Sequence, residues 1–225
     1  MTTQLAFDLG HRPALGVDDF LVAPCNQAAV AWLDLWPDWP APALTIHGPK
    51  GCGKTHLAHV WRSRTNARFI AVEALGDLSP YAMLEGGNAC IIDNLGNAGF
   101  DEAALLHLYN AARETGGHIL MNSDTPPSAW GMTLNDLRSR LVAAPTVGVD
   151  APDDSVLGAI LVKLFQDRQL RVEPEILSYI LIRMERSFAA AEAIVAALDK
   201  AALAARRAIT IPLARDILGQ LQTDT

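Results

Sequence analysis

The sequence has few cysteines and few basic residues, and it contains no long apolar run. Cys25, Cys52 and Cys90 are odd in number and show no paired spacing, which argues against a disulfide framework or a cysteine metal site. The apolar stretches fall well short of the roughly 20 residues that a membrane span needs. Residues 1–10 lack the pattern of a secretory signal. We therefore expect reduced thiols and a soluble cytoplasmic protein.

Basic residues are outnumbered by acidic ones, 18 against 25, which gives a formal charge of −7. A protein that binds duplex DNA by itself usually carries a basic surface, so we expect any link to DNA to run through partner proteins. Half of the 225 residues are hydrophobic, which provides a core and excludes a disordered chain. The length suits one large domain or a domain with a smaller second one.

Short apolar runs alternate with helical periods in the middle of the chain, whereas residues 1–42 are expected to be irregular. This alternation predicts an α/β domain with a mostly parallel sheet and crossover helices. After Asp150 only helical periods remain, which predicts a small all-α domain. We expect three segments with boundaries at 1–18, 19–150 and 151–225. The predicted strands are 43–47, 68–72, 89–92 and 118–121, and the predicted helices between them include 54–64 and 101–115.

A phosphate-binding motif, G-x-x-x-x-G-K-[ST], lies between a predicted strand and a predicted helix. Its glycines let backbone N–H groups curl around phosphate oxygens, while the lysine reaches the β and γ phosphates and the hydroxyl holds Mg²⁺. With this composition the expected number of chance matches is about 1 in 500. The motif predicts an ADP or ATP site with Mg²⁺ formed by Gly48, Pro49, Lys50, Gly51, Cys52, Gly53, Lys54 and Thr55.

The apolar run Cys90–Ile92 ends in Asp93 and Asn94. An acid at the end of such a strand, downstream of a phosphate loop, is typical of the second nucleotide motif, so Asp93 and Thr55 are the candidate Mg²⁺ ligands. Hydrolytic relatives carry a second acid that polarises the attacking water, and here Asn94 stands in its place. Since a missing general base removes about 10² to 10⁴ in rate, we predict slow or absent self-hydrolysis.

Several further segments resemble the AAA+ module of the DnaA replication initiators, and more closely the shortened Hda regulators of that initiator. The resemblance spans nearly the whole chain, and it implies an AAA+ sheet domain followed by a helical lid. Asp93-Asn94 is itself an Hda-like pairing. The segments that carry the resemblance are Asp19–Asn26, Gly53–Leu57, Met121–Pro127, Leu137–Leu141 and Ile209–Leu213.

The resemblance also implies roles for single residues. Phe20 and Leu21 would help to enclose the adenine, and His56 belongs to the phosphate-loop exit. Either Asn122 or Asp124 would sense the γ-phosphate or the attacking water. The resemblance further implies an arginine finger, a residue that reaches the nucleotide of a neighbouring subunit. We favour Arg140 for this role, and Arg138 is the alternative.

The lid departs from the family pattern. Ala189 stands where these families usually place a nucleotide-contacting arginine, called sensor 2. Arg186 lies nearly one helical turn earlier and is a possible substitute. Lid control of the nucleotide is therefore in doubt.

Residues 4–9 look like the short peptide by which bacterial proteins dock on the replicative sliding clamp. Leu5, Phe7 and Leu9 alternate with polar or small residues, so an extended backbone would point them into one groove, while Gln4 offers an amide. A loose terminus or an edge strand would also explain so short a pattern.

The resemblance as a whole implies a regulator of replication initiation. It would bind ADP or ATP with Mg²⁺ and dock on the clamp. It would then stimulate hydrolysis of ATP bound to a DnaA-type initiator. A homo-oligomer is compatible with the same resemblance. Because the sequence stops after the lid, we do not expect a complete initiator with its own DNA-reading domain. The alternatives are a helicase-loader or transposition-helper ATPase, and a small-molecule kinase with the same loop.

Overall fold

The structure is a computed structural model that describes residues 21–96, 99–205 and 208–223. It divides into two compact units. The first, which we call the sheet unit, contains the chain up to His47 together with Thr55–Val149; the second, the lid unit, contains Gly48–Lys54 together with the chain from Asp150 onward. In the described part of the chain, no helix is long and apolar enough to cross a membrane.

Five strands form the sheet, in the order β2-β3-β4-β1-β5, and every neighbouring pair is parallel. This confirms the predicted parallel sheet. All residues of β3 are buried, as expected for a strand covered on both faces. Because the strands run the same way, their carboxyl ends share one edge. The strands are β1 (Ala43–His47), β2 (Arg68–Ile70), β3 (Ala89–Ile92), β4 (His118–Ser123) and β5 (Thr146–Gly148).

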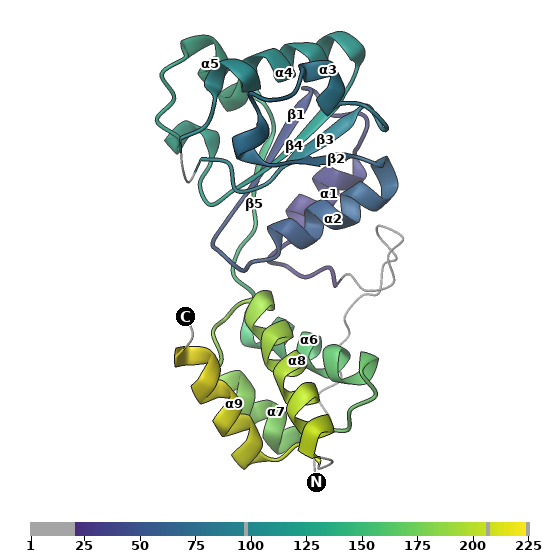
Figure 1. Cartoon of the computed structure of the whole chain (residues 1–225), viewed down its shortest axis with the longest axis vertical. Helices are drawn as coiled ribbons and strands as arrows, with labels where there is room; N and C mark the ends of the chain where they lie inside the picture. Colours follow the sequence, from purple (N-terminus) through teal and green to yellow (C-terminus); the bar gives the residue numbers. More distant parts are fainter. Residues whose placement is uncertain (1–20, 97–98, 206–207, 224–225) are drawn as a thin grey trace. The chain divides into compact units, whose positions relative to one another are not determined.

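Helices cover both faces of this sheet. Asp101 caps the longest of them, α4, by accepting a hydrogen bond from the Ala104 N–H at 2.9 Å, and Gly116 ends it with a left-handed φ of 66°. Two short 3₁₀ helices, η1 (Val72–Ala74) and η2 (Pro127–Ala129), join neighbouring elements. Figure 1 shows α1 (Gln27–Asp34) and α2 (Lys54–Thr65) on one face, and α3 (Pro80–Met83), α4 (Glu102–Thr115) and α5 (Asn135–Ala143) on the other.

The expectation of irregular structure up to residue 42 is wrong for α1. Three prolines between 37 and 42 dominate the sequence pattern there, but they lie beyond the end of the helix. The Asn26 side chain accepts from the Ala23 N–H at 2.9 Å and so fixes the turn that precedes the helix. Ala29, Val30 and Leu33 are buried on its inner face. Tertiary packing therefore stabilises a helix that local signals did not indicate.

Two strand predictions also differ from the structure. The predicted strand 68–72 ends early at Ile70, because Val72 begins η1. β5 was not predicted, since its three residues contain a single buried apolar side chain, Val147, and show no readable alternation.

The lid unit is built from four helices around its own apolar core. Leu157, Leu161, Ile180, Val195 and Leu198 are all buried in it, which agrees with the predicted helical stripes. The helices are α6 (Asp154–Asp167), α7 (Pro174–Arg183), α8 (Phe188–Ala205) and α9 (Ile211–Thr223).

Candidate nucleotide-binding site

The phosphate loop is shaped by glycines at two turns. Gly51 and Gly53 have φ values of 78° and 103°, in the region that side chains disfavour. A Cβ at Gly51 would lie 2.5 Å from the Cβ of Ser187, and the Phe188 N–H donates to the Gly51 carbonyl at 3.0 Å. These contacts explain why residues 48–54, which we expected within the sheet domain, are grouped with the lid unit.

Lys54 is buried, with 7% of its surface exposed. Its ammonium donates to the Gly48 carbonyl at 2.7 Å and to the Pro49 carbonyl at 3.0 Å. The loop thus folds around a buried positive charge at the start of α2, where a helix N-terminus adds to the attraction for phosphate. By contrast, Pro49 and Lys50 are exposed, while Gly48 and Cys52 are buried.

Asp93 gathers three donors at the carboxyl edge of the sheet. Thr55 Oγ1 donates to its Oδ2 at 2.8 Å, Asn122 Nδ2 donates to its Oδ1 at 3.2 Å, and the Asn94 N–H donates to the same oxygen at 3.1 Å. This convergence follows from the register, which pairs Ile92 of β3 with Met121 of β4 and so brings the next residues of both strands together. The structure therefore joins Thr55, Asp93 and Asn122, three of the predicted site residues.

A hydroxyl and a carboxylate at this separation fit Mg²⁺, which prefers oxygen ligands and completes its shell with water and substrate phosphates. Asn122 is fully buried, and its Oδ1 has no hydrogen-bond partner in the described structure. A buried acceptor of that kind is suited to a donor such as an ordered water. Asp124 follows the end of β4 and is partly exposed. Of the two sensor candidates, Asn122 has the direct contact with Asp93.

Asn94 is exposed and adopts a left-handed φ of 60°, a conformation that asparagine tolerates well. It carries no carboxylate, so a second acid is missing next to Asp93. The residues at this edge are suited to holding a metal and phosphate, and Asn94 itself supplies no carboxylate that could act as a general base.

Arg140 lies on α5 and is held inside its own unit. Its Nε and Nη2 donate to the two carboxylate oxygens of Asp136, each at 3.0 Å, and its guanidinium carbon lies 5.8 Å from the centroid of the Tyr109 ring. Arg138, the alternative finger, is exposed. Asp136 and Tyr109 were not among the predicted site residues; the four-residue spacing of Asp136 and Arg140 on a helix is the signal that indicates the contact with Asp136.

The remaining predicted residues are less clustered. In the lid unit Arg186 pairs with Asp154 through two contacts of 3.0 and 3.1 Å, and Ala189 is exposed in the first turn of α8. Leu21 is partly buried and His56 is exposed. The clamp-peptide residues Gln4, Leu5, Phe7 and Leu9, together with Phe20, lie outside the described residues.

Comparisons with known proteins match the lid unit to a family and the whole chain to a fold. Residues 154–218 match the family model described as "Hda, lid domain". Domain III of the replication initiation protein DnaA from Thermotoga maritima has the same fold, with a TM-score of 0.73 and 19% identity over 90% of this chain and 94% of that one. The chain therefore has the fold of an AAA+ sheet domain followed by a helical lid of the Hda type.

Two further proteins are similar to this chain. AMPPCP-bound DnaA from Aquifex aeolicus is similar with a TM-score of 0.63 and 18% identity, over 82% of this chain and 65% of that one. An uncharacterized protein of Haemophilus influenzae is 26% identical over 197 residues, 80% of this chain and 83% of the relative. At these identities the structural likeness establishes the fold, and activity must be argued from the site.

Proposed function

We propose that this DnaA-related AAA+ protein binds ADP or ATP with Mg²⁺ as a structural ligand and acts on the ATP of a DnaA-type initiator. The observation that carries the proposal is the complete Thr55–Asp93–Asn122 network with Asn94 in place of a second acid. Such a site supports binding and disfavours turnover. The AMPPCP bound to the DnaA relative supports an adenine nucleotide as the ligand.

Within this proposal the phosphate loop wraps the phosphates through its N–H groups and the Lys54 ammonium. Thr55 and Asp93 hold the metal, which neutralises phosphate charge when bound. Asn122, buried beside Asp93, reports the state of the γ-phosphate. The bound nucleotide orders the loop, and the protein's own hydrolysis stays below roughly 1 per second, the low end of enzyme turnover.

Stimulation of the initiator is assigned to Arg140. An arginine supplied in trans is worth about 10³ to 10⁵ in turnover because it stabilises charge on the transferring phosphoryl group. Gln4, Leu5, Phe7 and Leu9 would bring the protein to the sliding clamp, so that hydrolysis follows clamp loading and restrains re-initiation. This activity belongs to the bacterial cytoplasm, near the nucleoid or the replisome.

The test measures phosphate released from initiator-bound ATP in the presence of clamp-loaded DNA. Adding the wild-type protein should raise release, Arg140→Ala should remove the rise, and Arg138→Ala is the matched control that should retain it. Gln4→Ala should lose co-elution with the clamp. An equal rise with Arg140→Ala would overturn the finger assignment. Direct DNA binding with a steep salt dependence would instead favour a helicase-loader type ATPase.

A further inference from the structure

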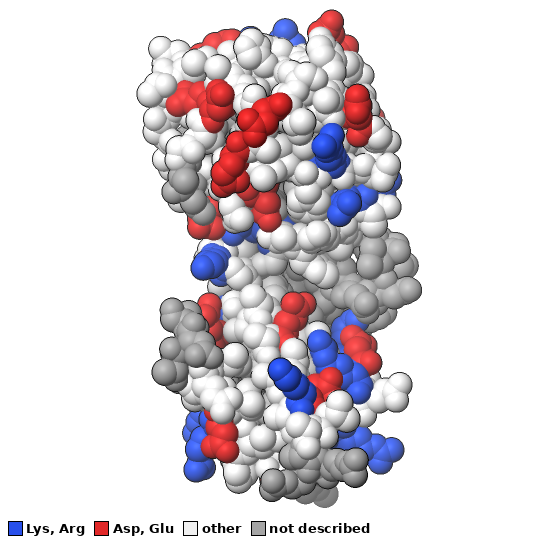
Figure 2. All heavy atoms as spheres, viewed as in Figure 1, with Lys and Arg blue, Asp and Glu red and all other residues white. Residues whose placement is uncertain are grey.

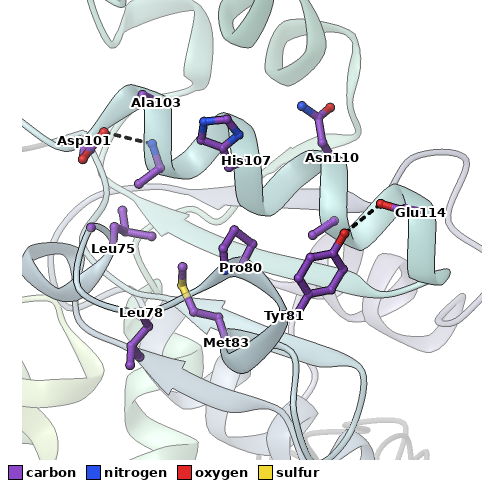
Figure 3. A pocket seen from close by; sticks show the side chains of 13 residues that line it. Leu75, Leu78, Pro80, Tyr81, Met83, Asp101, Ala103, His107, Asn110 and Glu114 are labelled. Atoms are coloured by element: carbon purple, nitrogen blue, oxygen red, sulfur yellow. Dashed lines mark hydrogen bonds between the residues drawn. The ribbon is translucent and has the colours of Figure 1, made fainter.

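A second candidate site lies in the sheet unit, in a groove between α4 and the segment 75–83. The groove has a volume of about 540 Å³. Figure 3 shows Asp101 and Glu114 at its two ends, with His107 and Asn110 on α4 between them. The facing side is largely apolar: Leu78, Pro80 and the exposed Tyr81 ring line it, above the fully buried Leu75 and Met83.

The two carboxylates and the Asn110 amide oxygen in this groove are hydrogen-bond acceptors. One Asp101 oxygen accepts from the Ala104 N–H at the start of α4, and the Glu114 carboxylate accepts from the Tyr81 hydroxyl at 2.9 Å. Asn110 Oδ1 is buried and has no hydrogen-bond partner in the described structure. The lining contains neither Lys nor Arg, and His107 is its one side chain that can become cationic. Such a set favours an occupant that brings donors and positive charge.

The chain around the groove is mainly acidic. Between residues 69 and 117 the sequence contains seven acidic residues and one basic residue, Arg113, while Arg68 donates to the Ala82 carbonyl of the segment 75–83 at 3.1 Å. Figure 2 shows acidic side chains prevailing on the visible face of the sheet unit. A nucleic acid or an acidic peptide would be repelled here, because its charge has the same sign as the surface. The acidic residues of this stretch are Glu73, Asp77, Glu85, Asp93, Asp101, Glu102 and Glu114.

The dimensions of the groove specify the occupant further. Asp101 and Glu114 are thirteen positions apart, which is about 20 Å along a helix. An extended peptide covers about 20 Å in six residues. Alternate side chains of such a peptide point the same way, so two cations six positions apart and the apolar residues between them can all face the groove.

We propose that this groove binds an extended cationic peptide of a partner protein, with Lys or Arg at positions 1 and 7 and apolar side chains at positions 3 and 5. The two carboxylates hold the cations, and the apolar wall covers the side chains between them. This inference goes beyond the proposed function, and it does not depend on nucleotide binding or on Arg140.

The probe is the labelled peptide acetyl-Lys-Ala-Leu-Ala-Leu-Ala-Lys-amide, and the readout is fluorescence anisotropy in 50 mM salt. We expect saturable binding with a Kd of about 0.1 mM, as suits a small contact. Binding should weaken in 300 mM salt because the charges are exposed. The same peptide with Glu in place of Lys should not bind.

Two variants locate the site. The double variant Asp101→Asn with Glu114→Gln removes both charges, keeps a good cap on α4 and should weaken binding at least about 10-fold. Ala103→Trp fills the groove and should abolish binding. The matched control, Glu73→Gln with Glu85→Gln, removes two acids that do not line the groove and should change the Kd less than about 2-fold. Thermal unfolding checks that every variant is folded.

Four outcomes would overturn the proposal. One is no saturable binding of the cationic peptide at 2 mM in 50 mM salt. Another is binding of the acidic peptide, or of a single-stranded oligonucleotide, as tight as that of the cationic one. A third is an equal loss in the control variant, which would assign binding to general surface charge. Finally, self-association that Ala103→Trp removes would assign the groove to a second copy of this chain.

Discussion

Charged side chains have different surroundings in the sheet unit and in the lid unit. At the carboxyl edge of the sheet, Thr55 and Asn122 both donate to the Asp93 carboxylate, and this set of oxygens is suited to a metal. In the lid unit the cation that precedes α8, Arg186, is paired with Asp154 of the same unit, and the uncharged Ala189 stands at the position where the family resemblance led us to expect an arginine.

The difference indicates which residues respond to a nucleotide. A polar network of three elements at a strand edge is suited to binding a ligand, whereas the buried apolar core of the lid, which includes Leu157, Ile180 and Val195, stabilises that unit. We therefore expect substitutions at the motif to alter nucleotide affinity strongly and substitutions at the lid arginine position to alter it little.

The largest expected effect is that of Lys54→Ala. Its buried ammonium supplies charge-assisted hydrogen bonds worth about 1.5 to 3 kcal/mol each, so losing them should weaken MgADP binding by about 100-fold or more. Titration calorimetry measures the change. Lys50→Ala, an exposed residue of the same loop and the same charge, is the matched control and should cost less than about 3-fold. Equal losses would mean that the loop attracts phosphate only through its net charge.

Asn94→Asp is expected to have the next largest effect. The change supplies the missing acid beside Asp93, and a general base contributes about 10² to 10⁴, so self-hydrolysis of ATP should rise at least about 10-fold. Asn94→Ser at the same exposed position controls for the loss of the amide. Phosphate release by the isolated protein is the measurement. A brisk wild-type rate would contradict the view of the bound nucleotide as a structural ligand.

How much of this could be read from the sequence differs between elements. β1, α2 and Lys54 follow from a motif whose spacing is rarely met by chance, and the α/β sheet follows from buried runs. The helix α1 could not be predicted from the sequence, because its stability comes from Ala29 and Leu33 packing inside the fold. The hydrogen bond from Asn122 to Asp93 could not be predicted either, because it depends on strand register.

Other parts of the structure had no signal of their own. The groove is formed by side chains of the segments 75–83 and 101–114, which are separated in the sequence. No local sequence pattern therefore predicts it. The Tyr109 ring meets Arg140 only because α4 packs beside α5. Such contacts arise from tertiary packing, which periodicity and propensity do not encode.

A smaller effect is expected from Ala189→Arg in the lid. The substitution places a cation at an exposed position of α8, where the family resemblance led us to expect one, and a single solvent-accessible charge should raise nucleotide affinity by about 2- to 5-fold at most. Arg186→Ala is the companion variant, measured by the same calorimetry, and should change affinity less than about 2-fold because Arg186 already pairs with Asp154. A 10-fold loss with Arg186→Ala would break the contrast, since the lid would then supply an essential cation.

The smallest expected effect concerns acid stability of the sheet unit. The backbone N–H groups of Thr133, at 3.0 Å, and Leu134 donate to the Glu102 carboxylate, and these bonds lower its pKa below the ordinary value of 4.5. A carboxylate with a depressed folded-state pKa stabilises the fold above its unfolded-state pKa. That contribution is lost as the pH falls through the folded-state pKa.

Glu102→Gln should therefore lower the denaturant midpoint at pH 7, and its difference from the wild type should shrink as the pH falls below about 4.5. Tryptophan fluorescence is a suitable probe, because all five tryptophans belong to the sheet unit and report on it alone. Glu192→Gln, on the exposed side of α8, makes the same chemical change in the lid unit and should leave this signal unaltered. A difference between Glu102→Gln and the wild type that stays constant from pH 7 to pH 3 would show that the charge of Glu102 does not link the start of α4 to the segment before α5.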